Sequence, residues 1–383
     1  MTLVCALEVC EVPETNALAH AIARVTAAGA DALCILACDA DNWTPSLADP
    51  ALTGVGIPLF GGVFPKLIRG AEALDSGTLV LGLKGHFEVF TIEQLSRDEA
   101  AVTEQVAAMQ ASLEAFPSLI VLPDGLASNI ERLVEELYSS VGGDCKPVGG
   151  GAGSLDFIQK PCLFSNKGML EDAALIVATK RRYAAGVSHG WQTLEGPFLV
   201  TGAHGNTLEY LNYQPAFDVY RKVVEAHAGM RFSNHAFFDI AKTYPLGIAS
   251  VDGDILVRDP LKLDGTSLVC VGDVPVNSTV YLLEGVCESL VAASAGAAKE
   301  ALVASGIPED VKPVEERQTA LVFDCISRSL FLANEFDREL EAIVGHLNKS
   351  TEVIGALTLG EIGQSRHGPF QLLNKSTVIA LFS

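Results

Sequence analysis

One pentapeptide in the chain has the pattern of a turn that carries a serine nucleophile. Residues 186–190 read GVSHG and match the GxSxG turn, in which a serine sits between a strand and a helix. In such a turn Ser188 would attack a carbonyl carbon, and a histidine later in the chain would accept its proton. The following residues, WQTLEGPFLVTG, hold a Gly-Pro pair and then a strand, so they do not provide the required helix. We expect a turn that presents His189 and Trp191 to a pocket, and a serine hydrolase is kept as an alternative.

A glycine-rich run, GGGAG at residues 149–153, lets the backbone come close to another group. The run is not a P-loop, because no Gly-Lys-Ser/Thr follows it. It is not a GxGxxG fingerprint either, because Ser154 stands where the last glycine should be. Two interpretations remain. Gly150 and Gly151 could contact a ligand, or the run could allow a tight crossing of two chain segments.

The eight histidines lack the spacing of a metal site. There is no HExxH, and no His/Asp/Glu cluster has metal-ligand spacing, so we expect no metal site. CxxCH is absent, which excludes this mode of covalent haem attachment but leaves a single axial histidine to non-covalent haem open. His189 and His204 are the candidates for that role.

Arg328 follows a strand and a turn that read FDCIS. A guanidinium at this place could clamp the carboxylate of a ligand through two hydrogen bonds. It could equally tie two loops together through Glu361, and the sequence favours neither reading.

Charge and hydropathy exclude several classes of partner. The 383 residues carry a formal net charge of -21, with no block of basic residues, so we expect no nucleic acid and no anionic membrane as partner. Mean hydropathy is +0.31, yet the longest apolar stretches are strand-sized, far short of the about 20 residues that span a bilayer. The start of the sequence lacks a basic n-region, and the nine cysteines form no CxxC. These features predict a cytoplasmic protein with reduced cysteines.

The elements that must position these residues alternate between helices and apolar strands. Residues 118–178 read as strand, acidic turn, capped helix, glycine-rich strand end, Asn-Lys and strand, and residues 319–382 repeat that order. Asn166-Lys167 and Asn374-Lys375 take matching places in the two copies. Residues 182–284, between the copies, read mainly as short strands. We predict an α/β fold with mixed sheets built by two pseudo-repeated αβ halves and helices on the outer faces; chance similarity of two ordinary αβ units is the alternative.

In the order and spacing of its motifs the chain resembles the FIST family of sensory proteins. The N-terminal half of the family is matched by GGGAGS, GVSHGW and PFLVTGAHGNTLEYLNYQPAFDVYRKVVE, and the C-terminal half by FDCISRSLFL, GALTLGEIG and LLNKSTVIALF. The resemblance runs from about residue 32 to residue 383. It implies an N-terminal FIST domain over residues 1–250 and a C-terminal one over residues 251–383.

The resemblance implies a stand-alone small-ligand sensor in bacterial signal transduction and not an enzyme. Its ligand would be an amino acid or a related metabolite, and it would act on a separate partner such as a histidine kinase. One branch of stand-alone members binds haem and senses nitric oxide, so a haem-based nitric oxide sensor is an alternative. The family often has histidine before the last Asn, where this chain has Leu373, so no role of that histidine carries over. The apolar composition is also compatible with a homodimer.

Ligand sensing calls for a pocket, which we predict between the two halves. The predicted lining is Gly150, Gly151, His189, Trp191, Arg328, Glu361 and Asn374.

Overall fold

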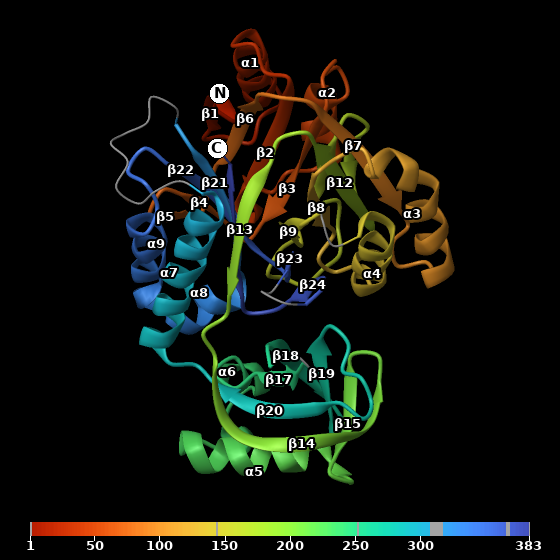
Figure 1. The fold of residues 1–383 in the computed structure, drawn as a ribbon, viewed down its shortest axis with the longest axis vertical. Coiled ribbons are helices and arrows are strands. Elements are labelled where there is room, and N and C mark those ends of the chain that lie inside the picture. Colours follow the sequence, from red (N-terminus) through yellow and green to blue (C-terminus); the bar gives the residue numbers. More distant parts are fainter. Residues whose placement is uncertain (1, 143–144, 251–252, 307–316, 365–367, 383) are drawn as a thin grey trace.

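A computed structural model describes residues 2–142, 145–250, 253–306, 317–364 and 368–382. The described chain forms two modules (Figure 1). A three-sheet module contains the described residues up to 191 and from 285 onward, and both ends of the chain lie in it. A small module, residues 192–284, lies below it in Figure 1 and is built on a sheet of its own.

The sheets of the three-sheet module share one arrangement. The first has the strand order β1-β6-β2-β3-β10-β11, the second β7-β12-β8-β9-β23-β24 and the third β13-β25-β21-β22-β4-β5. The strands of the first sheet are β1 (Val4–Cys10), β2 (Ala32–Cys38), β3 (Leu59–Phe64), β6 (Thr78–Leu83), β10 (Leu163–Ser165) and β11 (Gly168–Leu170). Those of the second are β7 (Phe87–Glu93), β8 (Ser118–Pro123), β9 (Val148–Gly150), β12 (Ala173–Thr179), β23 (Glu361–Gln364) and β24 (Phe370–Leu373). Those of the third are β4 (Lys66–Arg69), β5 (Glu72–Leu74), β13 (Tyr183–Ser188), β21 (Thr319–Cys325), β22 (Glu352–Thr358) and β25 (Thr377–Phe382).

Three αβ units exchange hairpins to make these sheets. Each unit has a parallel pair, β2–β3, β8–β9 or β21–β22, and a third strand antiparallel to the first. The hairpin that follows each pair leaves for another sheet: β4–β5 pairs with β22, β10–β11 with β3, and β23–β24 with β9. The predicted α/β class with repeated units is therefore confirmed, and residues 32–83 add a third copy that the sequence analysis missed.

The same close contact recurs in all three parallel pairs. An added Cβ at Gly61, Gly149 or Gly355 would lie 1.8 to 2.0 Å from the carbonyl oxygen of the facing residue on the neighbouring strand. Any side chain there would force the two strands apart. The middle of each second strand is therefore restricted to glycine.

An acidic residue at the end of the first strand of each unit, or just after it, holds the start of the third strand. The hydrogen bonds are Thr78 Oγ1 to Asp41 at 2.8 Å, the Asp172 amide to Asp124 at 2.9 Å, and Thr377 Oγ1 to Asp324 at 2.9 Å. These carboxylates are buried and each accepts hydrogen bonds inside the fold, although Oδ2 of Asp324 has no hydrogen-bond partner among the described residues. The acidic turns of the repeat are thus structural.

The matching of the two Asn-Lys pairs was wrong. Asn166 and Lys167 form the tight turn between β10 and β11, whereas Asn374 and Lys375 follow the hairpin and link β24 to β25. The place equivalent to Asn374-Lys375 in the earlier copy is the link between β11 and β12. Local sequence order misled here because the two pairs lie on opposite sides of a hairpin.

Helices cover the outer faces of the sheets, as predicted (Figure 1). They are α1 (Thr15–Ala27) and α2 (Pro45–Leu52) on the first sheet, α3 (Glu99–Leu113) and α4 (Ile130–Val141) on the second, and α7 (Cys287–Ala304), α8 (Ile326–Leu332) and α9 (Phe336–Gly345) on the third. Alanine-rich α7 lets β13 approach its backbone, because an added Cβ at Gly186 would lie 1.9 Å from the Ala297 carbonyl oxygen. Within the described residues, no helix is both long and apolar enough to span a membrane.

The small module has its own core. Its sheet has the order β14-β20-β17-β18-β19-β15-β16, with α5 (Ala216–Ala228) packed against it. The strands are β14 (Gln192–His204), β15 (Thr207–Leu211), β16 (Gln214–Pro215), β17 (Leu246–Ala249), β18 (Ile255–Asp264), β19 (Ser267–Val271) and β20 (Thr279–Glu284), and α6 (Phe237–Ala241) precedes β17. Tyr220 of α5 is buried and donates a hydrogen bond to the Tyr244 carbonyl at 2.7 Å. The apolar face of α5 thus closes this core.

Two chain segments join the modules and lie side by side. They are residues 189–191 and residues 285–286. The Ser289 hydroxyl donates to the Gly190 carbonyl at 2.7 Å, and an added Cβ at Gly285 would lie 2.6 Å from the Trp191 ring. The two crossings therefore contact each other where the modules meet.

Candidate ligand-binding site

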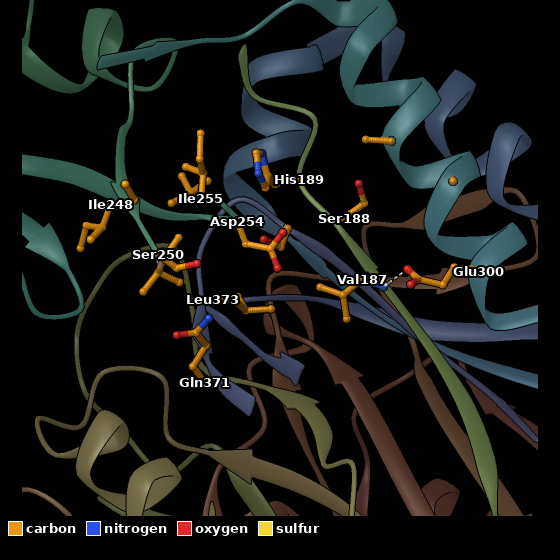
Figure 2. Close-up of a pocket in the computed structure, with 16 residues that line it drawn as sticks. Val187, Ser188, His189, Ile248, Ser250, Asp254, Ile255, Glu300, Gln371 and Leu373 are labelled. Atoms are coloured by element: carbon orange, nitrogen blue, oxygen red, sulfur yellow. Dashed lines mark hydrogen bonds between the residues drawn. The ribbon is translucent and has the colours of Figure 1, made fainter. Parts of the chain in front are cut away.

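A cavity of about 350 Å³ lies beside the crossings, with walls from both modules. We call it the His189 cavity. Its walls come from the end of β13, from β17 and the start of β18, from α7, and from β24 with the link that follows it. Figure 2 shows its side chains, which are Val187, Ser188, His189, Ile248, Ala249, Ser250, Asp254, Ile255, Leu256, Val257, Ala293, Gly296, Glu300, Gln371, Leu373 and Ser376.

The turn after β13 fixes His189 in this cavity. Gly190 has a φ of +77°, and an added Cβ there would lie 2.7 Å from the Ser289 carbonyl oxygen. Only glycine can take this conformation without strain. Behind the turn, the Trp191 amide donates to Nδ1 of His189 at 3.0 Å, so both the backbone and the imidazole are held.

The imidazole of His189 is neutral at neutral pH. Burial, and to a lesser extent the nearby Arg328 guanidinium, lower the pKa of His189 from its usual 6.5 to about 4, and the charge of Asp254 opposes this shift. In a neutral imidazole one nitrogen accepts and the other carries the proton. Because Nδ1 accepts from the Trp191 amide, the proton sits on Nε2. His189 is therefore a hydrogen-bond donor through Nε2.

This tautomer does not suit a catalytic base for Ser188. A base must offer a lone pair to the serine hydroxyl. In His189 the lone pair of Nδ1 accepts from the Trp191 amide, and Nε2 carries the proton. The chain after Ser188 also crosses into β14 instead of starting a helix. GVSHG is thus the end of a strand followed by a crossing turn.

The same geometry does not fit an axial ligand to haem iron. An imidazole binds iron through an unprotonated nitrogen, whereas His189 accepts from Trp191 at Nδ1 and carries its proton on Nε2. His204 is exposed at the end of β14, opposite Thr207 of β15, and does not line the His189 cavity. Among the residues that the structure describes, no cluster of His, Cys, Asp and Glu could hold a metal ion.

The charged side chains that line the cavity are both acidic. They are Asp254 and Glu300, and no lysine or arginine is among the described lining residues. Oδ2 of Asp254 is buried without a hydrogen-bond partner in the described part of the chain. Glu300 accepts from the Val187 amide at 3.5 Å, the dashed line in Figure 2. The cavity therefore favours a group that donates hydrogen bonds or carries positive charge.

Arg328 is fully buried and its donors are used inside the protein. It binds Glu339 at 2.8 and 3.0 Å and Ser294 at 2.9 Å, and it also donates to the carbonyl oxygens of His189 and Lys375. The structure thus places it in the packed interior behind His189. Among the described residues no hydrogen bond joins it to Glu361, which instead accepts from Thr358 at 2.8 Å. The clamp on a ligand carboxylate stays a prediction.

Trp191 and Glu361 are also buried next to this network. Nε1 of Trp191 donates to the Lys375 carbonyl at 3.0 Å, and its ring packs on Phe331 at 5.3 Å between centroids. Burial raises the pKa of Glu361 to about 8, against the hydrogen bonds that it accepts from Thr358 and the Ser376 amide. Neither side chain lines the His189 cavity.

The two predicted glycines lie in a tight chain crossing. An added Cβ at Gly150 would lie 2.6 Å from the Thr358 side chain, and one at Gly151 would lie 2.4 Å from the Leu359 carbonyl oxygen. This is the second of the two readings that the glycine run allowed. Of the seven residues predicted to line the pocket, the structure brings His189 into this cavity and Asn374 into a second one; a ligand contact by the others stays a prediction.

The sequence analysis missed Asp254, although this side chain brings a carboxylate with an unpartnered oxygen to the cavity. It lies directly before β18, in a stretch of the sequence that reads DGD. Such stretches are common between strands for conformational reasons alone. Nothing local marks this carboxylate as a cavity residue, because the opposite wall comes from α7 and β13.

Two family models match the chain. The FIST N domain matches residues 32–214 and the FIST C domain matches residues 216–364. The fold and the matches together define a protein with paired sensory domains. The chain belongs to the FIST family, and the resemblance seen in the sequence is confirmed.

Domains of this family are associated with sensing small ligands in signal transduction. The comparison with proteins of curated function gave no match. The family models meet near residue 215, and the division at residue 250 stays a prediction.

Proposed function

We propose that this protein is a sensor whose His189 cavity binds a small cationic amine, of the kind derived from an amino acid. The observation that carries the proposal is the unpartnered Oδ2 of Asp254 in a cavity whose described lining has no cationic side chain. A buried carboxylate oxygen without a donor is costly. An ammonium group would supply both the donor and the balancing charge.

The same charges disfavour a ligand carboxylate. A free amino acid would bring its carboxylate into a space shared with Asp254 and Glu300. The one donor that His189 offers is the neutral Nε2–H, and Arg328 is held away from the cavity by Glu339. We therefore expect affinity to fall in the order amine, amino acid, carboxylic acid.

Binding at this place can be transmitted because both modules line the cavity. Ser250, Ile255 and Asp254 belong to the small module, whereas Val187 and Glu300 belong to the three-sheet module. A ligand that contacts both walls favours one relative position of the modules by its difference in affinity for the two. A separate signalling protein, such as a histidine kinase, would read that position.

Three related compounds test the ligand class. Isoamylamine, leucine and 4-methylpentanoate share one branched chain and differ in the amine and carboxylate that they carry. Isothermal titration with the full chain should show the tightest binding for isoamylamine and the weakest for 4-methylpentanoate. Equal affinities, or a preference for the acid, would show that the carboxylates of the cavity do not select its ligand.

A further inference from the structure

A second cavity shares a wall with the His189 cavity. Leu373 and Ser376 line the first, whereas Asn374 between them lines the second. We call the second the Asp259 cavity, after its most buried acidic residue. It has a volume of about 80 Å³ and lies where β18 of the small module meets the start of α8 and the crossing at Leu359.

The Asp259 carboxylate is only half satisfied. Its side chain is 2% exposed. Oδ2 accepts from the Ser327 hydroxyl at 2.7 Å and from Nζ of Lys375 at 3.1 Å. Oδ1 has no hydrogen-bond partner among the described residues. A buried carboxylate oxygen in this state leaves one donor to be supplied from outside the protein.

The remaining walls of the Asp259 cavity are mostly apolar. Phe238, Leu261 and Leu359 contribute side chains to it, and Leu330 and Phe157 line it while being 36% and 52% exposed. A water molecule could donate to Oδ1, but it would make no favourable apolar contact with these walls. A ligand with an apolar body and one donor would make both the hydrogen bond and the apolar contacts.

We propose that the Asp259 cavity is a second ligand site, which takes a compact neutral molecule with an apolar body and one N–H or O–H donor directed to Oδ1 of Asp259. This site does not depend on the amine site proposed above.

The charge of the ligand follows from Lys375. Nζ of Lys375 lies 3.1 Å from Asp259 and also donates to the Lys242 carbonyl at 2.9 Å, so the carboxylate already has its counter-charge. A second cation would be repelled by this ammonium group in a poorly solvated place. The two cavities therefore select differently, because no lysine or arginine is among the described residues that line the His189 cavity.

Pyrrole and furan form a matched pair of probes for this site. The rings have nearly the same size, but pyrrole donates a hydrogen bond and furan cannot. Titration of the full chain with methyl-labelled leucine should show shifts at Leu261, Leu330 and Leu359, with pyrrole binding about tenfold tighter than furan. Equal affinities, shifts confined to other methyl groups, or no binding of pyrrole, as a water-filled cavity would give, would overturn the proposal.

Two substitutions sharpen this test. Asp259→Asn keeps the shape but replaces a carboxylate, so the preference for pyrrole should disappear. Leu330→Ala removes part of the apolar wall at an exposed position and should weaken both probes alike. Asp254→Asn in the other cavity should leave both probes unchanged, so that failure here and failure of the amine site are seen separately. If Asp259→Asn does not fold, the comparison of the two probes on the unaltered chain still decides the matter.

Discussion

The backbone amide of Trp191 donates a 3.0 Å hydrogen bond to Nδ1 of His189. Because Nδ1 accepts this bond, the proton of the neutral ring sits on Nε2. His189 then has no free lone pair with which to accept a proton or bind a metal ion. The GVSHGW motif thus holds His189 in the cavity wall, with its Nε2–H available as a hydrogen-bond donor. Its tryptophan holds the histidine from behind while packing on Phe331 and the crossing segment.

Replacing His189 should make the protein less sensitive to acid. The pKa of His189 is about 4 in the folded chain and close to 6.5 in an unfolded one. Between these values the unfolded chain takes up a proton that the folded chain refuses, so the free energy of unfolding falls as the pH is lowered from 6.5 to 4. In His189→Gln this part of the fall should be missing.

Urea unfolding at pH 7.5, 5.5 and 4.5 measures this difference. His235→Gln, at an exposed position, serves as the control and should lose stability in acid as the unaltered chain does. An acid response of His189→Gln equal to that of the control would contradict the burial of His189 as a neutral ring.

Glu361 should give a pH dependence of the opposite sign. Burial raises the pKa of Glu361 from 4.5 to about 8. The folded chain therefore keeps a proton that the unfolded chain has released, and the free energy of unfolding falls as the pH rises from 4.5 to 8. Glu361→Gln should flatten this fall between pH 5 and pH 8 in chemical denaturation, whereas Glu341→Gln on the exposed side of α9 should not. The same slope in all three proteins would show that Glu361 is not protonated when folded.

Arg328 is expected to support the fold without touching the ligand. Arg328→Ala leaves Glu339 and Asp324 buried without their cation, which should cost about 3–5 kcal/mol of the free energy of unfolding. Arg338→Ala, which breaks an exposed contact with Glu335, should change stability little.

The role of Arg328 in binding needs a separate readout. At a temperature where Arg328→Ala remains folded by circular dichroism, its affinity for isoamylamine should stay within about twofold of the unaltered chain, since the guanidinium does not line the cavity. A large loss of affinity in the folded variant would restore the ligand clamp that the sequence allowed.

The close contact between paired strands should make Gly355 intolerant of any side chain. An added Cβ would lie 2.0 Å from the Val322 carbonyl oxygen, so Gly355→Ala should lose about 1–3 kcal/mol or more. Gly345→Ala, at the end of α9 with no atom within 4 Å of the added Cβ, should be neutral or stabilising. Thermal unfolding of both variants checks this, and equal midpoints would argue against the parallel pairing of β21 and β22.

The repeat was predictable from sequence only where its signals are local. Strand, acidic turn and helix could be recognised at residues 118–141 because α4 has a strong apolar face. The equivalent helix of the first unit, α2, is short and contains Pro50, which hid the copy at residues 32–83. The exchange of hairpins between sheets was not predictable, because pairings such as β4 with β22 join residues that are far apart in the chain.

The candidate site was predicted in part for the same reason. His189 could be found because the turn around it has a distinctive pattern of glycine, histidine and tryptophan. Asp254 could not, since only the packing of β17 and β18 against α7 and β24 makes it a cavity residue. Arg328 shows the opposite case: its sequence position suggested a ligand contact, but its guanidinium donates hydrogen bonds to Glu339 and Ser294 in the interior.

The most direct test of the amine site is the affinity of isoamylamine for Asp254→Asn. Asp264→Asn is its matched control, because it makes the same change at an exposed position on β18. Isothermal titration should show a loss of affinity of about tenfold or more for Asp254→Asn, as expected for removal of a charge-assisted hydrogen bond, and a change within about twofold for Asp264→Asn. Equal binding by Asp254→Asn and the unaltered chain would contradict the claim that this carboxylate selects the ligand.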